Sequence, residues 1–337
     1  MCPHNLLSNL RALDVAALPI SQYSRGALKR VLDYDSYYLD IYQLCMEAVC
    51  DACGKRPEEM TVVDYGGGHG LFSMAAKVAG FAKVVYIDIN PDSETTVRVL
   101  SASLGFAPDV ILQGDSDVLA DWCIENRLSP DALVAVDVIE HIYNLDVFFS
   151  SMNRVSNSMA MVFTTASTPC NPMIKRRLHR IMMKDELSGD MSFLKQRRDY
   201  IRGRYASMDD DMLDYWASNT RGLTFGDINK AIAENRPNRL DDSYNTCDPA
   251  TGSWTERILP LEDYQDAVDR YGLVASVAPG FYNGNQSSLK GILCRLVNRI
   301  MCLMKSSPQP VRGNYRLSFK LRMSVAPFIY IFVTKKN

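Results

Sequence analysis

The chain has 337 residues, is 47% apolar and has a formal net charge of −2. This length allows one large domain or two smaller ones. Its nine cysteines are odd in number and lack the spacing of a disulfide framework, which excludes a secreted disulfide scaffold and predicts reduced cytoplasmic thiols. No apolar run approaches the roughly 18 uncharged residues of a membrane-spanning helix, so we expect none.

Residues 1–60 are predicted to be helical. The apolar spacing of residues 39–49 fits a helix that packs just before the first strand. A tyrosine cluster precedes this helix, at Tyr34, Tyr37 and Tyr38. We expect these rings to pack in the core, and the alternative is that they cover a ligand.

From residue 61 the pattern alternates between strand and helix. The predicted strands are Thr61–Tyr65, Lys83–Asp88, Val110–Gln113, Ala132–Val136, Ala160–Thr165, Leu273–Val277 and Phe328–Val333. Short apolar, β-branched strands between helices predict an α/β fold, a Rossmann-like doubly wound and mostly parallel sheet covered on both faces.

Two segments interrupt this alternation. Residues 170–258 lack a strand of comparable quality, and we expect a mainly helical insertion that caps the substrate site. Residues 284–326 are expected to form a basic amphipathic insertion between the last two strands. The Rossmann-like domain would then comprise residues 61–169 and 259–337.

A glycine-rich turn follows the first predicted strand, in the sequence Asp64-Tyr-Gly-Gly-Gly-His-Gly70. Glycines allow a sharp turn and a close approach to a bound molecule, and the next helix directs its free N–H groups at that molecule. The spacing is G-x-G-x-G, with Leu71 where the dinucleotide-binding pattern requires its last glycine. The spacing therefore argues against a dinucleotide.

Acidic residues follow the other predicted strands. Asp88 ends the second strand about 20 residues after the glycines, where an acid suits the two hydroxyls of a ribose. Asp115 after the third strand is placed to accept from an adenine amino group, and Asp137 ends the fourth. Taken alone, Asp88 is better explained as a solvated loop acid or a helix cap, but the acids and the glycine turn together predict an adenosine ligand with a polar extension.

These motifs resemble those of the class I S-adenosylmethionine-dependent methyltransferases of the small-molecule type. Residues 62–70 match the first motif of that family, Val85-Tyr-Ile-Asp-Ile89 its ribose-binding motif, and Gly114-Asp-Ser116 its adenine-side motif. Asp137-Val-Ile-Glu-His-Ile142 resembles a stretch found in many small-molecule members. The resemblance covers residues 40–168 and 260–333, and it implies a seven-stranded sheet whose last strand is antiparallel.

The resemblance also implies the roles of single residues. Gly66, Gly68 and Gly70 would pass along the methionine part of the cofactor, Asp88 would hold the ribose, and Ile89 would lie against the adenine. The cofactor-binding residues expected in this way are Asp64, Tyr65, Gly66, Gly67, Gly68, Gly70, Asp88, Ile89, Asp115, Ser116, Asp137 and Val138.

The candidate general base is His141, one turn beyond the fourth strand, since an acceptor hydroxyl must lose a proton as it attacks. The alternative is that His141 fixes the loop in a structural role. We expect Glu140 to be structural, and His179 in the basic insertion is a second candidate base. No acid cluster with metal-ligand spacing is recognised, so no metal site is expected.

The predicted function is methyl transfer from S-adenosylmethionine to a small-molecule or glycan acceptor, including phosphorylated or lipid-linked ones. A nicotinamide-dependent oxidoreductase and a non-catalytic adenosine-binding module are the alternatives. The N/D-P-P-(Y/F/W) motif of many nucleic-acid methyltransferases is missing after the fourth strand, so we expect no specific nucleic-acid partner.

The C-terminal part of the chain is basic. No Asp or Glu follows Asp269, while 11 Lys or Arg do, and residues 289–305 fit a basic amphipathic helix. We expect its apolar face to pack on the body of the protein. The alternative is a peripheral membrane contact through 289–305, at the inner face of a membrane.

Overall fold

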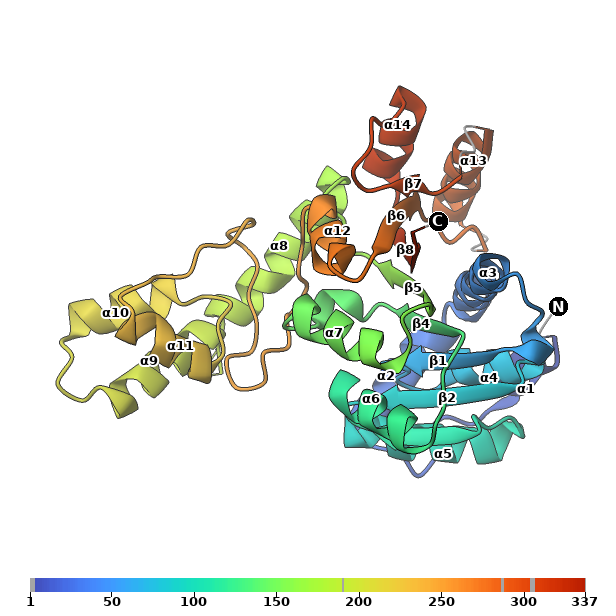
Figure 1. Cartoon of the computed structure of the whole chain (residues 1–337), viewed down its shortest axis with the longest axis horizontal. Helices are drawn as coiled ribbons and strands as arrows, with labels where there is room; N and C mark the ends of the chain where they lie inside the picture. Colours follow the sequence, from blue (N-terminus) through green and yellow to red (C-terminus); the bar gives the residue numbers. More distant parts are fainter. Residues whose placement is uncertain (1–3, 190, 286–287, 304–306, 337) are drawn as a thin grey trace.

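The computed structural model describes residues 4–189, 191–285, 288–303 and 307–336. Within these residues, eight strands form one sheet in the order β3-β2-β1-β4-β5-β8-β6-β7 (Figure 1). The strands are β1 (Thr61–Tyr65), β2 (Lys83–Asp88), β3 (Val110–Gln113), β4 (Ala132–Val136), β5 (Ala160–Thr165), β6 (Leu273–Pro279), β7 (Gln309–Pro310) and β8 (Ile329–Lys335).

The seven predicted strands are all present, and the Rossmann-like fold class is confirmed. Strands β1 to β5 are parallel to their neighbours, whereas β8 lies antiparallel between β5 and β6. The additional strand is β7, a two-residue element that pairs with Ser276 and Val277 of β6. A strand of two residues has too short a pattern to be recognised in the sequence.

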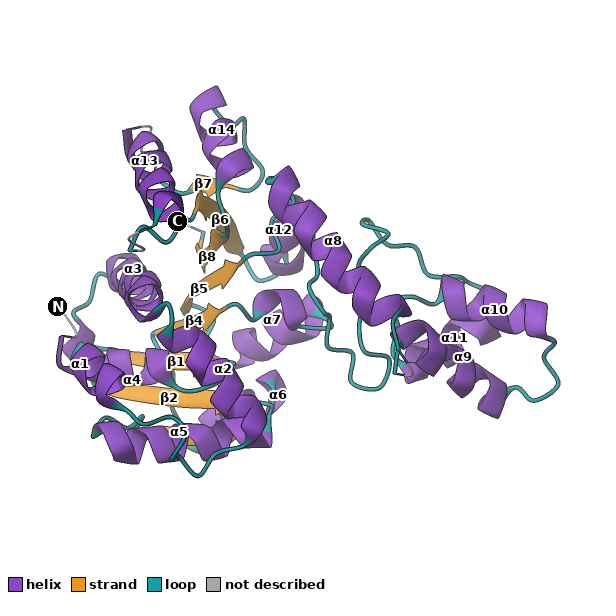
Figure 2. Ribbon diagram, turned by 180° about the vertical axis from the view of Figure 1, so that it is seen from behind, coloured by secondary structure: helices purple, strands orange, loops and turns teal. Residues whose placement is uncertain are grey.

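Helices cover both faces of the sheet (Figure 2). One face carries α1 (His4–Ala12), α2 (Gln22–Leu32), α3 (Asp35–Cys53), α4 (Leu71–Val78) and α5 (Pro91–Leu104). The other carries α6 (Ser116–Glu125), α7 (Leu145–Val155), α12 (Leu261–Asp269) and α14 (Leu317–Val325). Buried side chains fill the space between the sheet and the helices on each face. The central strands are continuous apolar runs because neither of their faces contacts water.

Four helices lie between β5 and α12. They are α8 (Pro172–Leu187), α9 (Phe193–Arg204), α10 (Asp210–Asn219) and α11 (Phe225–Ala233). The last three form a separate group beside the sheet body, joined to it by the long α8 (Figure 1). Their interior is a small apolar cluster around Trp216. The buried guanidinium of Arg197 on α9 pairs with Glu186 on α8 and donates to the Ala217 carbonyl of α10 at 2.9 Å.

The expectation that the apolar face of helix 289–305 packs on the body is wrong. Helix α13 (Leu289–Leu303) leaves Leu293 and Leu296 more than half exposed, and residues 304 and 305 lie outside the described residues. The reason is that Asn298 and Arg295, on the opposite side, hydrogen-bond the backbone of residues 282–284. Among the described helices, none combines the length and apolarity needed to cross a membrane.

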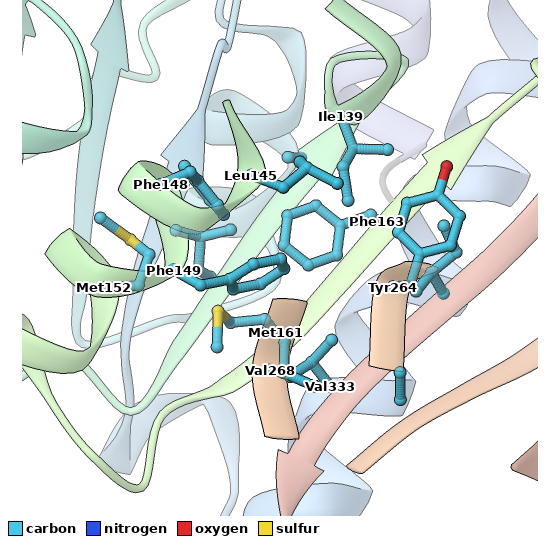
Figure 3. Close-up of a cluster of buried hydrophobic side chains, with 14 of the residues drawn as sticks. Ile139, Leu145, Phe148, Phe149, Met152, Met161, Phe163, Tyr264, Val268 and Val333 are labelled. Atoms are coloured by element: carbon cyan, nitrogen blue, oxygen red, sulfur yellow. The ribbon is translucent and has the colours of Figure 1, made fainter. Parts of the chain in front are cut away.

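The core beneath α7 and α12 is rich in aromatic rings (Figure 3). Phe148 packs edge-to-face on Phe149, Phe163 and Tyr65, with ring centroids 5.0–5.9 Å apart. Such pairs are attractive beyond the area that they bury. The tyrosine belongs to the end of β1, so this cluster supports the strand that carries the glycine turn.

We therefore expect Phe148→Ala to lower the free energy of unfolding by about 3–5 kcal/mol, because it leaves a cavity among these rings. Val147→Ala on the same helix is the matched control, since Val147 is 49% exposed and should change stability by less than about 0.5 kcal/mol. Urea denaturation of both variants measures the difference. Equal stabilities would show that the ring cluster does not support the fold.

Candidate active site

The turn between β1 and α4 depends on glycines with positive φ. Gly66, Gly68 and Gly70 have φ of 66°, 52° and 74°, in the left-handed region that glycine tolerates best. A Cβ on Gly66 would lie 2.6 Å from a methyl group of Val138, whereas a Cβ on Gly68 would meet no atom within 4 Å. Gly66 is therefore required by close packing against the end of β4, and Gly68 faces open space where a ligand has room.

Asp88 joins the end of β2 to this turn. One carboxylate oxygen accepts a hydrogen bond from the Gly68 amide at 2.9 Å, and the other accepts from the Asn90 amide at 2.8 Å. Burial raises the pKa of Asp88, and these two hydrogen bonds partly offset that effect. The Tyr86 hydroxyl also donates to the Gly68 carbonyl, at 2.7 Å. The predicted ribose-binding acid and the glycine turn thus form one connected unit.

Asp64 lies behind the turn and is 3% exposed. It accepts hydrogen bonds from the amide and hydroxyl of Ser73, at 3.0 and 2.6 Å, in the first turn of α4. Burial raises the pKa of Asp64 to about 7, against the effect of the two Ser73 hydrogen bonds. A Cβ on Gly67 would lie 2.7 Å from this carboxylate and 2.6 Å from the Tyr86 ring. Asp64 therefore fixes the helix start, and Gly67 is required by crowding.

The adenine-side residues form a looser group. Ile89 is 72% exposed, and Asp115 caps α6 by accepting from the amides of Asp117 and Val118 at 3.0 and 3.2 Å. Ser116, the first residue of α6, is buried. Burial raises the pKa of the Tyr65 hydroxyl, and the nearby carboxylates of Asp115 and Asp88 raise it further. Both acids are therefore near Tyr65, although Asp115 has no hydrogen bond to the glycine turn among the described contacts.

Asp137 ends β4 in a strained conformation. Its φ of 55° is in the left-handed region, where a residue with a side chain is uncommon. The Asp137 amide donates to the carbonyl and hydroxyl oxygens of Thr164 in β5, at 3.1 and 3.2 Å. Asp137 is exposed to solvent, although protein atoms crowd its carboxyl group. Partial desolvation by these atoms and the nearby carboxylate of Glu256 raise the pKa of Asp137 to about 6, while His141 acts in the opposite direction.

His141 is held by the chain segment that returns from the helical insertion. Its Nδ1 lies 2.8 Å from the carbonyl oxygen of Trp254, which can only accept, so Nδ1 carries the proton and Nε2 is the free acceptor. The Trp254 amide donates back to the His141 carbonyl at 3.3 Å, and the Arg257 amide donates to the Glu140 carbonyl at 3.1 Å. Residues 254–257 therefore pair with residues 140–141.

Glu140 is 2% exposed, and its Oε2 has no hydrogen-bond partner. Burial, followed by repulsion from Asp137 and Glu256, raises the pKa of Glu140 well above its usual range. Burial and the two neighbouring acidic groups therefore both favour the protonated form of Glu140.

The sequence analysis missed Glu256. It comes from the end of the insertion, and it accepts a hydrogen bond from the Ser167 hydroxyl at 2.6 Å, close to the ends of β4 and β5. Nothing local in the sequence indicates this position, because 118 residues lie between Asp137 and Glu256.

Tyrosines of α3 also reach the site. Burial raises the pKa values of Tyr37 and Tyr38, and the Asp137 carboxylate raises both further. The Tyr330 hydroxyl is buried and has no hydrogen-bond partner among the described residues. Burial raises its pKa, and the Asp137 carboxylate adds to this increase. Tyr37 packs on Phe281 and Phe328, and both Tyr37 and Tyr38 lie against the apolar core, as expected. Tyr34 is instead 43% exposed.

His179 lies apart from this group. Its Nε2 is 3.0 Å from Asp242, and its ring stacks on Tyr244 with centroids 3.9 Å apart, both within the insertion.

A cavity of about 630 Å³ lies between the insertion and helices α7 and α12, and its lining includes Tyr143, Trp254 and Arg257. Another cavity, of about 580 Å³, lies near the start of β4, at the end of the strand away from the glycine turn, and is lined by Lys55 and Asp131. Neither cavity is lined by the glycine turn.

Comparison with known proteins identifies the family to which the chain belongs. The model of a methyltransferase domain matches residues 37–217, which include the glycine turn, Asp88, Asp115 and Asp137. The chain belongs to this methyltransferase family. It is an S-adenosylmethionine-dependent methyltransferase, so the oxidoreductase and the non-catalytic module are set aside. None of the curated proteins matches the sequence.

Several solved structures resemble the methyltransferase. An S-adenosylmethionine-dependent methyltransferase from Mesorhizobium loti is 13% identical, with 86% of this chain and 96% of that chain covered and a TM-score of 0.40. A Haloferax volcanii putative methyltransferase, solved as a complex with the Trm112 activator, is 11% identical, with 88% and 93% covered and a TM-score of 0.42. A putative methyltransferase complexed with SAH is 10% identical, with 39% and 37% covered and a TM-score of 0.30.

The turn fits the cofactor of this family. Open space beside Gly68, a carboxylate at Asp88 and the exposed apolar side chain of Ile89 suit a methionine chain, a ribose and an adenine. When bound, the cofactor supplies an electrophilic methyl group on a sulfonium. Within the described part of the chain, no group of three or more His, Cys, Asp or Glu side chains is arranged to hold a metal ion.

We predict that Asp88→Asn weakens binding of S-adenosylhomocysteine by about 10- to 100-fold, because charge-assisted hydrogen bonds to the ribose are lost. Asp92→Asn is the control, since Asp92 is exposed in the first turn of α5. Isothermal titration calorimetry compares the two. An unchanged dissociation constant for Asp88→Asn would remove Asp88 from the cofactor site.

A second prediction concerns pH. Since the folded-state pKa of Asp64 is about 7 and its unfolded value is about 3.9, the folded protein binds more protons between these values. Asp64 therefore makes unfolding easier as pH rises from about 4 to 7, by on the order of 1 kcal/mol per pH unit. Asp64→Asn should remove this slope, as measured by urea denaturation at pH 5, 6 and 7. Parallel profiles for the two proteins would contradict the assignment.

Proposed function

We propose that this enzyme transfers the methyl group of S-adenosylmethionine to a hydroxyl group of a small-molecule or glycan acceptor in the cytoplasm. Phosphorylated or lipid-linked acceptors are included, because the C-terminal part of the chain is basic. The observation that carries the proposal is the tautomer of His141. Its Nδ1 proton is donated to the Trp254 carbonyl at 2.8 Å, which leaves Nε2 as a base.

A hydroxyl acceptor needs such a base. The proton of an alcohol must leave as its oxygen attacks the methyl carbon, and a positioned imidazole can accept it at neutral pH. His141 lies near Asp137, since it lowers the pKa of that carboxyl. A carboxylate near an imidazole stabilises the imidazolium that forms on proton uptake. His141 would therefore act as the general base, with Asp137 as its electrostatic partner.

The acceptor would lie among the groups that surround Asp137. A carboxylate with a pKa of about 6 is mostly ionised at pH 7, so Asp137 can accept hydrogen bonds from acceptor hydroxyl groups. Glu256 offers a second carboxylate from the insertion, and Tyr37 and Tyr38 offer aromatic surface from α3. Carboxylates beside aromatic rings suit a sugar or a similar polyhydroxyl compound.

The cofactor would occupy the turn next to these groups. We propose that Gly66, Gly67, Gly68 and Gly70 pass along its methionine part and that Asp88 holds its ribose. Tyr65, Ile89, Asp115 and Ser116 would then surround the adenine. Asp64 acts through Ser73 to hold α4, and Val138 supports Gly66.

The acceptor class can be tested directly. The enzyme is incubated with S-adenosylmethionine and pools of nucleotide sugars, free sugars, oligosaccharides, polyprenyl-linked sugars, tRNA and protein, and S-adenosylhomocysteine is measured. We expect product with a hydroxyl-bearing sugar or metabolite pool. Product with tRNA or protein alone would contradict the proposed acceptor.

We further predict that His141→Gln lowers kcat by about 100- to 10,000-fold with the acceptor so identified, because the glutamine cannot take up the proton. Binding of S-adenosylhomocysteine should change little. His179→Gln is the matched control and should keep kcat, since His179 contacts only Asp242 and Tyr244 in the described interactions. A kcat for His141→Gln equal to that of the control would leave His141 with a structural role.

A further inference from the structure

Helix α13 turns its apolar side to solvent. Leu289, Ile292, Leu293, Leu296 and Ile300 are between 48% and 85% exposed. At 100° per residue these five side chains fall within one 100° sector of the helix. Single exposed apolar residues are ordinary, but a continuous apolar stripe on a surface helix marks a contact site.

The opposite side of α13 is attached to the protein. The Asn298 side chain accepts from the Tyr282 amide at 2.8 Å and donates to the Tyr282 carbonyl at 2.7 Å. Arg295 donates to the Gly284 carbonyl at 2.6 Å, while Met301 is 5% exposed. These contacts fix the rotation of the helix about its axis, so the apolar stripe cannot turn inward without breaking them.

Helix α14 has a similar stripe. Leu317, Leu321 and Val325, spaced four residues apart, are 72%, 51% and 42% exposed, whereas Phe319 and Met323 are buried in the core. The Tyr282 hydroxyl donates to the Val325 carbonyl at 2.7 Å, and the Tyr282 backbone pairs with Asn298. One tyrosine therefore links both helices, which lie at the same end of the molecule, beyond β6 and β7 (Figures 1 and 2).

Exposed cations flank the two stripes. Lys290 and Arg299 lie on α13, and Arg316 and Lys320 lie at the start of α14. No Asp or Glu follows Asp269 in the sequence, and none of these four cations forms an ion pair among the described residues. The surface thus combines exposed apolar side chains with uncompensated positive charge.

We propose that α13 and α14 form a docking surface for an anionic lipid bilayer. An amphipathic helix of this composition lies in the interface plane, with its apolar side among the acyl chains and its cations at the lipid phosphates. A second copy of the chain fits less well, because pairing identical surfaces would bring like charges together. Docking here needs no methyl transfer, so it is tested separately from the proposed reaction.

The test is sedimentation of the full-length protein with two kinds of vesicle. One is pure phosphatidylcholine, and the other is phosphatidylcholine with about 30% phosphatidylglycerol, which gives roughly one negative charge in three lipids. We expect binding to the anionic vesicles and little to the neutral ones. Leu293→Ser with Leu296→Ser should abolish binding, and Leu317→Ser with Leu321→Ser should weaken it. Lys290→Gln with Arg299→Gln should weaken it about 25-fold, or about fivefold for each cation.

Matched controls change the same chemistry elsewhere. Ile124→Ser with Val147→Ser removes exposed apolar residues from α6 and α7, and Arg204→Gln with Arg236→Gln removes two exposed charges from the insertion. Both should bind vesicles as the unaltered protein does. All variants should keep their affinity for S-adenosylhomocysteine, which confirms that they are folded.

Three results would overturn the proposal. The first is failure of the unaltered protein to bind anionic vesicles. The second is a dimer in analytical ultracentrifugation that the Leu293→Ser, Leu296→Ser variant abolishes, which would assign the surface to a second copy. The third is an equal loss of vesicle binding in the controls and the helix variants, which would show that these helices have no special role.

Discussion

The hydrogen bond from the Gly68 amide to the Asp88 carboxylate is the contact on which the geometry of the glycine turn, the proposed cofactor site, depends. It requires the backbone to pass Gly66 and Gly68 with positive φ, and it requires β1 and β2 to be adjacent and in register. Asp64 then fixes the start of α4 through Ser73. The N-terminal end of this helix, with its free amide groups, therefore lies at the same turn. Most of the atoms that shape the turn belong to the backbone, and the side chains around it hold that backbone in position.

The second constraint comes from the insertion. Trp254 stacks on Tyr143, with centroids 6.2 Å apart, and Arg257 lies over its ring at 4.6 Å. The carbonyl of the same tryptophan orients His141, and Glu256 lies between Trp254 and Arg257 in the sequence. The insertion therefore brings an acidic group to the candidate site and also orients a histidine that lies in the short 3-10 helix after β4. Loss of this packing would remove the contact that orients His141, while the hydrogen bonds of the glycine turn do not depend on it.

Most of the fold could be predicted from the sequence, and so could the proximity of Asp88 to the glycine turn. The central strands were found because they are short, apolar and punctuated by glycines and acids, and the glycine turn with Asp88 has a recognisable spacing. Glu256 could not be found, because its place beside Asp137 results from a path of more than 100 residues through the insertion. The exposed stripe of α13 was predicted to be buried, since periodicity identifies the apolar side of a helix but says nothing of what that side faces. The hydrogen bonds of Asn298 and Arg295, together with the burial of Met301, decide that question.

The short strand β7 sets a limit on how the molecule can associate. A sheet edge presents unpaired amide and carbonyl groups to any other strand of suitable length. Here the outermost strand has only two residues, and one of them, Pro310, has no amide proton to donate. The sheet therefore ends at β7, and this strand is too short and too poor in amide donors to serve as a template on which another chain could pair regularly.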